Sequence, residues 1–183
     1  MTPADFADLA VRGTAWLAMA CYFLGAFLLL QTHGARPRFP ATRWIWAIGC
    51  DFYFWHVIAA FHFAHEWSHA AAVHSVNERA LAFTGQSASY GIWFNYAFLA
   101  AWIIDAAWLW SNEESYLRRR RALSWGLHGF LLFMVINGAI IFAPNYVRWP
   151  SAIALAVLGW AWFTSPAPPR RWRSASGRNL AQR

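Results

Sequence analysis

Five long hydrophobic segments, separated by short polar stretches, dominate this sequence. They cover residues 9–30, 44–65, 90–110, 124–143 and 149–164. A helix needs about 20 apolar residues to cross the roughly 30 Å hydrocarbon core of a bilayer, and the first four segments meet that length. The pattern therefore predicts an all-α, polytopic integral membrane protein, a helical bundle with about five transmembrane helices.

The composition agrees with this pattern. Of the 183 residues, 59% are hydrophobic and 13% are charged, whereas about a quarter of the residues in a soluble domain are charged. A soluble enzyme, a secreted disulfide scaffold and a disordered protein are thereby excluded. Cys21 and Cys50 both lie inside apolar segments, so we expect buried thiols and no disulfide framework.

The arginines predict the orientation of the chain. All basic residues are arginines, and most of them follow the first, third or fifth segment; only Arg12, Arg79 and Arg148 lie elsewhere. Basic residues accumulate in cytoplasmic loops, and this asymmetry holds only if the short fifth segment also crosses. We therefore expect an outside N-terminus and a cytoplasmic C-terminus, in the cytoplasmic (inner) membrane of a bacterium.

The predicted organisation is a single bundle over residues 1–165, followed by a disordered basic cytoplasmic tail over residues 166–183. The acidic N-terminal stretch lacks the basic start of a signal peptide, so the first segment is predicted to remain as a span. The expected partners are the lipid bilayer, with anionic headgroups at the cytoplasmic arginines, and a further copy or a larger membrane complex. No nucleic acid is expected.

Between residues 66 and 89, Ser75 and Glu78 fit a capping box and Gly85 fits a helix stop. These residues predict a short interfacial helix.

Ionisable residues in the second segment are the most informative feature. At about 100° per residue, one stripe carries Asp51, Trp55, Ile58, His62, His65, Glu66 and His69. Ionisable side chains inside a membrane are costly, at about 2.5–3.5 kcal/mol each on insertion scales. We therefore expect this stripe to face protein or water and not lipid.

Residues 65–69, HEWSH, match the pattern H-E-x-x-H. On a helix this pattern places two imidazoles one turn apart for zinc, with the glutamate as general base. It resembles the signature of zinc peptidases, including the intramembrane site-2-type metalloproteases, and the resemblance implies a catalytic Glu66. Those membrane enzymes take a further ligand from an Asp on a later helix, but Asp105 differs from His65 in depth by roughly 20 Å.

A looser hypothesis keeps a metal without proteolysis. His62, His65 and His69, with His74 or Glu78, would bind a transition metal (Zn, Cu or Fe) near the outer surface. Alternatively, the histidines hydrogen-bond Asn95, Tyr96 and one another without an ion. Haem is not expected, because His128 and His62 lie near opposite ends of their helices and could not bind the two faces of one iron.

A second polar group is predicted in the cytoplasmic half of the bundle. Asp51, Asp105 and His128 come from three segments at similar depth. They predict an intramembrane carboxylate–imidazole network, either a proton relay or an interhelical polar clamp. Asn95 and Tyr96 are counted with this intramembrane polar network as candidate residues.

The runs FHFAHEWSHAAA and FNYAFLAAWIIDAAW resemble small His- and Trp-rich multi-pass proteins of uncharacterised bacterial families. The resemblance covers two segments and carries no activity, although it directs attention to the histidines and to Asn95, Tyr96 and Asp105. The leading hypothesis is a membrane protein, not demonstrably an enzyme, that binds a metal through its His-rich face. The alternatives are an intramembrane zinc metallopeptidase and an accessory subunit of a larger complex.

Overall fold

The computed structural model describes residues 2–31 and 41–164, and every regular element in these two ranges is a helix. The helices are α1 (Pro3–Gln31), α2 (Ala41–Ala59), the π-helix η1 (Ala60–Ala64), α3 (His69–Thr84), α4 (Gly91–Ser111), α5 (Glu113–Arg118), α6 (Arg121–Ile136), the π-helix η2 (Asn137–Ile141) and α7 (Asn145–Thr164). The all-α prediction is confirmed for this part of the chain. The predicted tail over residues 166–183, and the loop that contains Arg36 and Arg38, lie outside the described residues.

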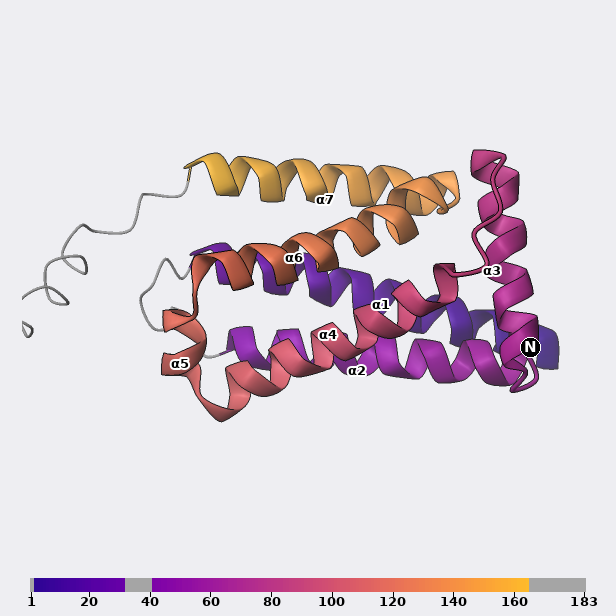
Figure 1. Cartoon of the computed structure of the whole chain (residues 1–183), viewed down its shortest axis with the longest axis horizontal. Helices are drawn as coiled ribbons and strands as arrows, with labels where there is room; N and C mark the ends of the chain where they lie inside the picture. The colour runs from indigo at the N-terminus through magenta and orange to yellow at the C-terminus, as the bar shows by residue number, and fades with distance from the viewer. Residues whose placement is uncertain (1, 32–40, 165–183) are drawn as a thin grey trace, which may run out of the picture.

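Five long helices form the body of the molecule. Figure 1 shows α1, α2, α4, α6 and α7 running roughly side by side, with α3 crossing one end of the bundle and α5 turning at the other. We refer to these as the α3 end and the α5 end. Helix α2 packs against α1 and α4, whereas α7 packs against α1 and against η2.

Within residues 2–31 and 41–164, four helical stretches are long and apolar enough to span a membrane. They are Pro3–Gln31, Ala41–Ala64, Gly91–Ser111 and Arg121–Ile141, and they correspond to the first four predicted segments. The fifth segment is also helical, since α7 has 20 residues, but α7 is not among the four. It begins before the predicted residue 149, so Pro150 lies in its second turn. Whether α7 crosses a membrane stays a prediction.

Aromatic side chains form the core between α1, α2 and α4. Tyr22, Trp46 and Trp102 are almost completely buried, and the rings of Trp46 and Trp102 lie 5.3 Å apart. Gly49 permits this packing: a Cβ there would lie 2.8 Å from the Cβ of Cys21 and 2.9 Å from Trp102. The outside of the bundle is apolar too, with Ile104, Phe133 and other large hydrophobic side chains exposed, as expected of a surface that faces lipid.

The connection over residues 66–89 contains the predicted short helix, but it begins earlier than predicted. Helix α3 starts at His69 and is capped by Ser68, whose hydroxyl accepts a hydrogen bond from the amide of Ala71. The capping box at Ser75 is therefore wrong, because Ser75 lies inside the helix. The stop at Gly85 is confirmed: its φ of 70° is left-handed, and its amide bonds the carbonyl of Leu81.

Candidate functional site

The chain does not remain helical through HEWSH. Helix α2 passes into η1, His65 ends η1 by donating its amide to the carbonyl of Ala60, and Glu66 and Trp67 adopt left-handed φ angles of 48° and 61°. A new helix then starts at His69. The prediction that His65 and His69 lie one turn apart on a single helix is therefore wrong, and Glu66 is not held beside two imidazoles as in a zinc peptidase.

The predicted metal ligands have separate partners. His62 accepts a hydrogen bond from the indole of Trp67 at 3.2 Å, His69 lies 3.0 Å from the hydroxyl of Tyr96, and His74 lies 3.4 Å from Glu78. Over residues 2–31 and 41–164, no three His, Cys, Asp or Glu side chains are grouped closely enough to hold a metal ion. The contact between His69 and Tyr96 is one of the hydrogen bonds that the metal-free alternative predicts. Metal binding by His62, His65, His69 and His74 stays a prediction.

Most of the polar stripe of the second segment lies on the outer surface of the single chain, where the described helices do not cover it. Asp51, Trp55 and His62 are all exposed. The reason is that α2 buries the opposite side, with Trp46, Gly49 and Cys50, against α1 and α4. The bulkier aromatic contacts thus determine how α2 is turned, and contact of the stripe with protein or water stays a prediction.

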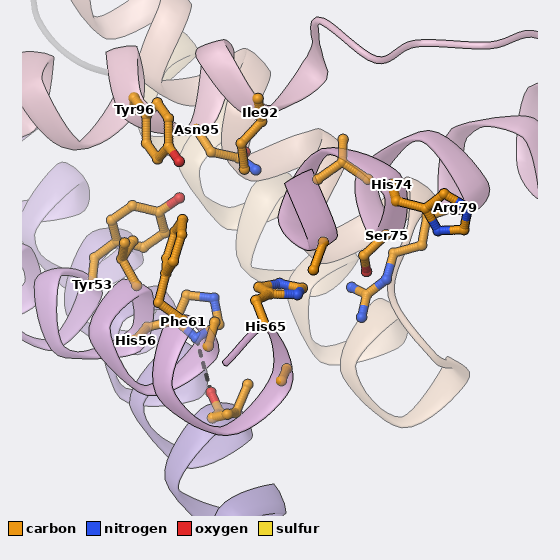
Figure 2. A pocket seen from close by; sticks show the side chains of 16 residues that line it. Tyr53, His56, Phe61, His65, His74, Ser75, Arg79, Ile92, Asn95 and Tyr96 are labelled. Carbon is orange, nitrogen blue, oxygen red and sulfur yellow. Dashed lines mark hydrogen bonds between the residues drawn. The ribbon is translucent and has the colours of Figure 1, made fainter. Parts of the chain in front are cut away.

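A cavity of about 380 Å³ lies at the α3 end, between η1, α3 and the adjoining ends of α1, α2 and α4. Its apolar wall includes Val57, Phe61 and Ile92, and its polar wall includes Asn95 and Tyr96. Three histidines also line it, namely His56, His65 and His74. Figure 2 shows lining side chains from α2, η1, α3 and α4 around this space, with the ring of His74 at its outer edge. The cavity combines a mainly apolar interior with polar groups, which is typical of small-molecule sites.

The strongest charge at the cavity belongs to Arg79 of α3. Figure 2 shows its guanidinium extending toward His65, and no acidic residue of the described chain lines the cavity. The pKa of His65 lies below its ordinary value, first because of partial burial and second because of the positive charge of Arg79. Deeper in the cavity, His56 donates from Nδ1 to the carbonyl of Val11 at 2.9 Å, which leaves its Nε2 as an acceptor.

A buried ion pair lies at the α5 end. The carboxylate of Asp105 accepts from the guanidinium of Arg119, from the indole of Trp46 at 2.9 Å and from the hydroxyl of Tyr116 at 3.0 Å. The guanidinium of Arg119 also lies 2.6 Å from Nε2 of His128 and 3.9 Å from the centre of the Tyr116 ring. We call Trp46, Asp105, Tyr116, Arg119 and His128 the buried charge cluster.

This cluster differs from the predicted polar network. Asp105 and His128 are brought together as predicted, but through Arg119, and Asp51 is excluded because it faces outward. Asn95 and Tyr96 lie at the opposite end, in the cavity. The sequence pattern does not indicate Trp46 or Tyr116, and it predicts Arg119, one of four consecutive arginines, at a cytoplasmic surface. Three donors contact the carboxylate of Asp105, and both alternatives, the polar clamp and the proton relay, stay predictions.

No model of a known protein family matches this chain, and no curated protein or solved structure matches it either.

Proposed function

We propose that this protein is a five-span membrane protein that binds a small amphipathic anion in the cavity at its α3 end. One observation carries the proposal: a cavity of about 380 Å³ has an apolar interior, an arginine at its wall and, among the described residues, no lining acid. Such a site suits a molecule with an apolar body and a carboxylate or phosphate group, because arginine binds both groups through paired hydrogen bonds.

The arrangement of the helices supports five spans. Helix α7 runs beside α6 and returns along the bundle (Figure 1). Arg148 stabilises the turn between them by donating to the carbonyls of Ile140 and Ala143 at 2.8 and 3.0 Å. In the described part of the chain, Arg43 and Arg118–Arg121 belong to helix ends at the α5 end. On the positive-inside rule, the α5 end faces the cytoplasm of a bacterium and the α3 end faces outward.

This orientation places α3 at the outer membrane surface and the cavity just beneath it. An amphipathic ligand would lie there with its apolar body toward Phe61 and Ile92 and its anion toward Arg79. The anion would also meet His65, whose neutral form can donate one hydrogen bond. A π-helix forms one wall of the cavity, and π-helical turns occur frequently at functional sites.

Photoaffinity labelling in lipid vesicles tests the proposal. The probes are a ten-carbon carboxylic acid with a photoreactive diazirine and the matched alcohol. We expect the acid to label peptides of η1, α3 and α4, and to label Arg79→Gln about tenfold less, which corresponds to about 1.4 kcal/mol of binding free energy. Ser75→Trp, which fills the cavity, should abolish labelling by both probes.

Arg12→Gln is the matched control, because this substitution removes the same charge at the same end of the bundle. Arg12 pairs with Asp8 and Tyr146 and does not line the cavity. Labelling of this variant should equal that of the wild type. Equal labelling by acid and alcohol, unchanged in Arg79→Gln, would leave an apolar site but contradict anion selectivity. Labelling that survives Ser75→Trp would contradict the site itself.

A further inference from the structure

Three polar side chains of the cavity have polar atoms without a partner in the described part of the chain. Tyr53, His56 and Asn95 all line the cavity, and each is half-buried. The hydroxyl of Tyr53 and the side-chain amide of Asn95 make no hydrogen bond to any described residue. Tyr53 is the thirteenth residue of the helical stretch Ala41–Ala64, near its middle. Polar atoms away from bulk water cost free energy unless they are hydrogen-bonded, so these atoms indicate a bound molecule or water in contact with them.

His56 presents a hydrogen-bond acceptor to the same cavity. Its Nδ1 donates to the carbonyl of Val11 at 2.9 Å, and no described acid lines the cavity to stabilise a charged imidazole. The ring is therefore neutral, and its Nε2 can only accept. Figure 2 shows the dashed hydrogen bond at one ring nitrogen of His56 and the other nitrogen turned the opposite way, into the cavity beside His65. The molecule that fills the cavity therefore needs a donor for Nε2.

The groups that such a donor would meet lie close together. The ring centres of Tyr53 and His56 are 5.7 Å apart, and the Tyr53 ring packs edge-on against Phe98 at 4.7 Å. Figure 2 shows the Tyr53 hydroxyl and the Asn95 amide on the side of the cavity away from Arg79. A hydroxyl group can donate to His56 and accept from Tyr53 or Asn95, whereas a ketone or an ester only accepts and would leave Nε2 of His56 unpaired.

We propose that the ligand of this cavity is an amphipathic hydroxy acid, whose hydroxyl donates to Nε2 of His56 and accepts from the hydroxyl of Tyr53. The inference rests on the proposed function, because Arg79 binds the anionic group of the same ligand. Figure 2 shows Arg79 and His56 on opposite sides of His65. The hydroxyl is therefore several carbon atoms away from the carboxylate and not beside it.

Competition against the photoreactive acid in lipid vesicles tests the hydroxyl and its position. The competitors are decanoic acid and its 2-, 6- and 10-hydroxy derivatives. At least one of the 6- and 10-hydroxy acids should displace the probe from the wild type at a concentration about tenfold lower than decanoic acid, as two added hydrogen bonds predict. The 2-hydroxy acid, with its hydroxyl beside the carboxylate, should show no such advantage.

Tyr53→Phe and His56→Phe should each reduce this advantage to about threefold or less, because each removes one hydrogen bond. Tyr53→Phe also keeps the aromatic ring that packs against Phe98. Tyr146→Phe is the matched control, because the hydroxyl of Tyr146 accepts from Arg12 and Tyr146 does not line the cavity. Each competitor partitions into the lipid equally for every variant, so the change in the ratio between variants measures binding.

Equal displacement by decanoic acid and all three hydroxy acids would overturn the inference and assign the polar atoms to water. The proposed function would still stand if decanoic acid displaced the probe and did so less well in Arg79→Gln. An advantage that is unchanged in both Tyr53→Phe and His56→Phe would also overturn the inference, because the hydroxyl would then be bound elsewhere. If no acid displaced the probe, the proposed function would fail and the inference with it.

Discussion

The guanidinium of Arg119 donates to the carboxylate of Asp105, and the two side chains are 4% and 0% exposed. Arg119 follows the short helix α5, whereas Asp105 lies within α4. The ion pair therefore connects the end of α5 to α4 and holds α5 against the end of the bundle. Removing one partner of a buried pair leaves an uncompensated charge, which costs more than the pair itself contributes.

Asp105→Leu should therefore destabilise the protein by about 3–5 kcal/mol, and Asp105→Leu with Arg119→Met should recover much of the loss. Arg118→Gln is the control, because its ion pair with Glu114 is exposed and should contribute less than about 1 kcal/mol. Unfolding by denaturant in detergent micelles measures all three variants. Equal losses of unfolding free energy in Asp105→Leu and Arg118→Gln would show that the buried pair contributes no more to stability than the exposed one.

His128 should be neutral, with its proton on Nδ1, in the folded protein. Its Nε2 lies 2.6 Å from Nη2 of Arg119, and a guanidinium can only donate, so Nε2 must accept. Nitrogen-15 NMR of selectively labelled histidine should identify this tautomer. His128→Phe should cost about 1–3 kcal/mol, because it leaves a buried donor without an acceptor. A protonated His128 at neutral pH would contradict the contact.

Gly49→Ala should disrupt the packing of α1 on α2. The added Cβ would lie within 3 Å of both Cys21 and Trp102, and overpacking of this kind costs about 1–3 kcal/mol. Gly159→Ala in α7 is the matched control, since its Cβ would meet nothing within 4 Å and alanine is the better helix former. The melting temperatures of the two variants should move in opposite directions.

Arg79→Gln should raise the pKa of His65 toward its ordinary value, because the charge of Arg79 is one of two causes that lower it. The neutral imidazole is favoured in the folded state, so the folded chain binds fewer protons than the unfolded chain. Stability should consequently fall as the pH drops from about 6.5 toward the lower pKa of folded His65. NMR titration of the His65 ring measures the pKa, and Arg12→Gln should leave it unchanged.

The metal hypothesis has a direct measurement in elemental analysis of purified protein. Because His62, His65 and His69 contact different neighbours and do not converge, we expect the metal content of the wild type to equal that of the double variant His65→Ala, His69→Ala. A stoichiometric metal in the wild type that the double variant loses would instead show that η1 and α3 rearrange around an ion.

Hydrophobic periodicity was sufficient to predict the helices. Which side of each helix packs against its neighbours is determined by the tertiary structure. Length and apolar content alone indicate the helical stretches, since crossing a bilayer sets both, and Gly85 indicated a helix end by its own backbone preference. The break after His65 was less visible, although Ser68 is a typical N-cap residue.

The direction in which α2 faces, and the partner of Asp105, depend on contacts between segments distant in the sequence. Trp46 and Trp102 pack against Tyr22 and thereby turn Asp51 outward, and α5 folds back so that one of four similar arginines reaches Asp105. Such choices are made by packing volume and by the need to compensate a buried charge. Neither can be computed along one helix, because both depend on which side chains the other helices bring to the same place.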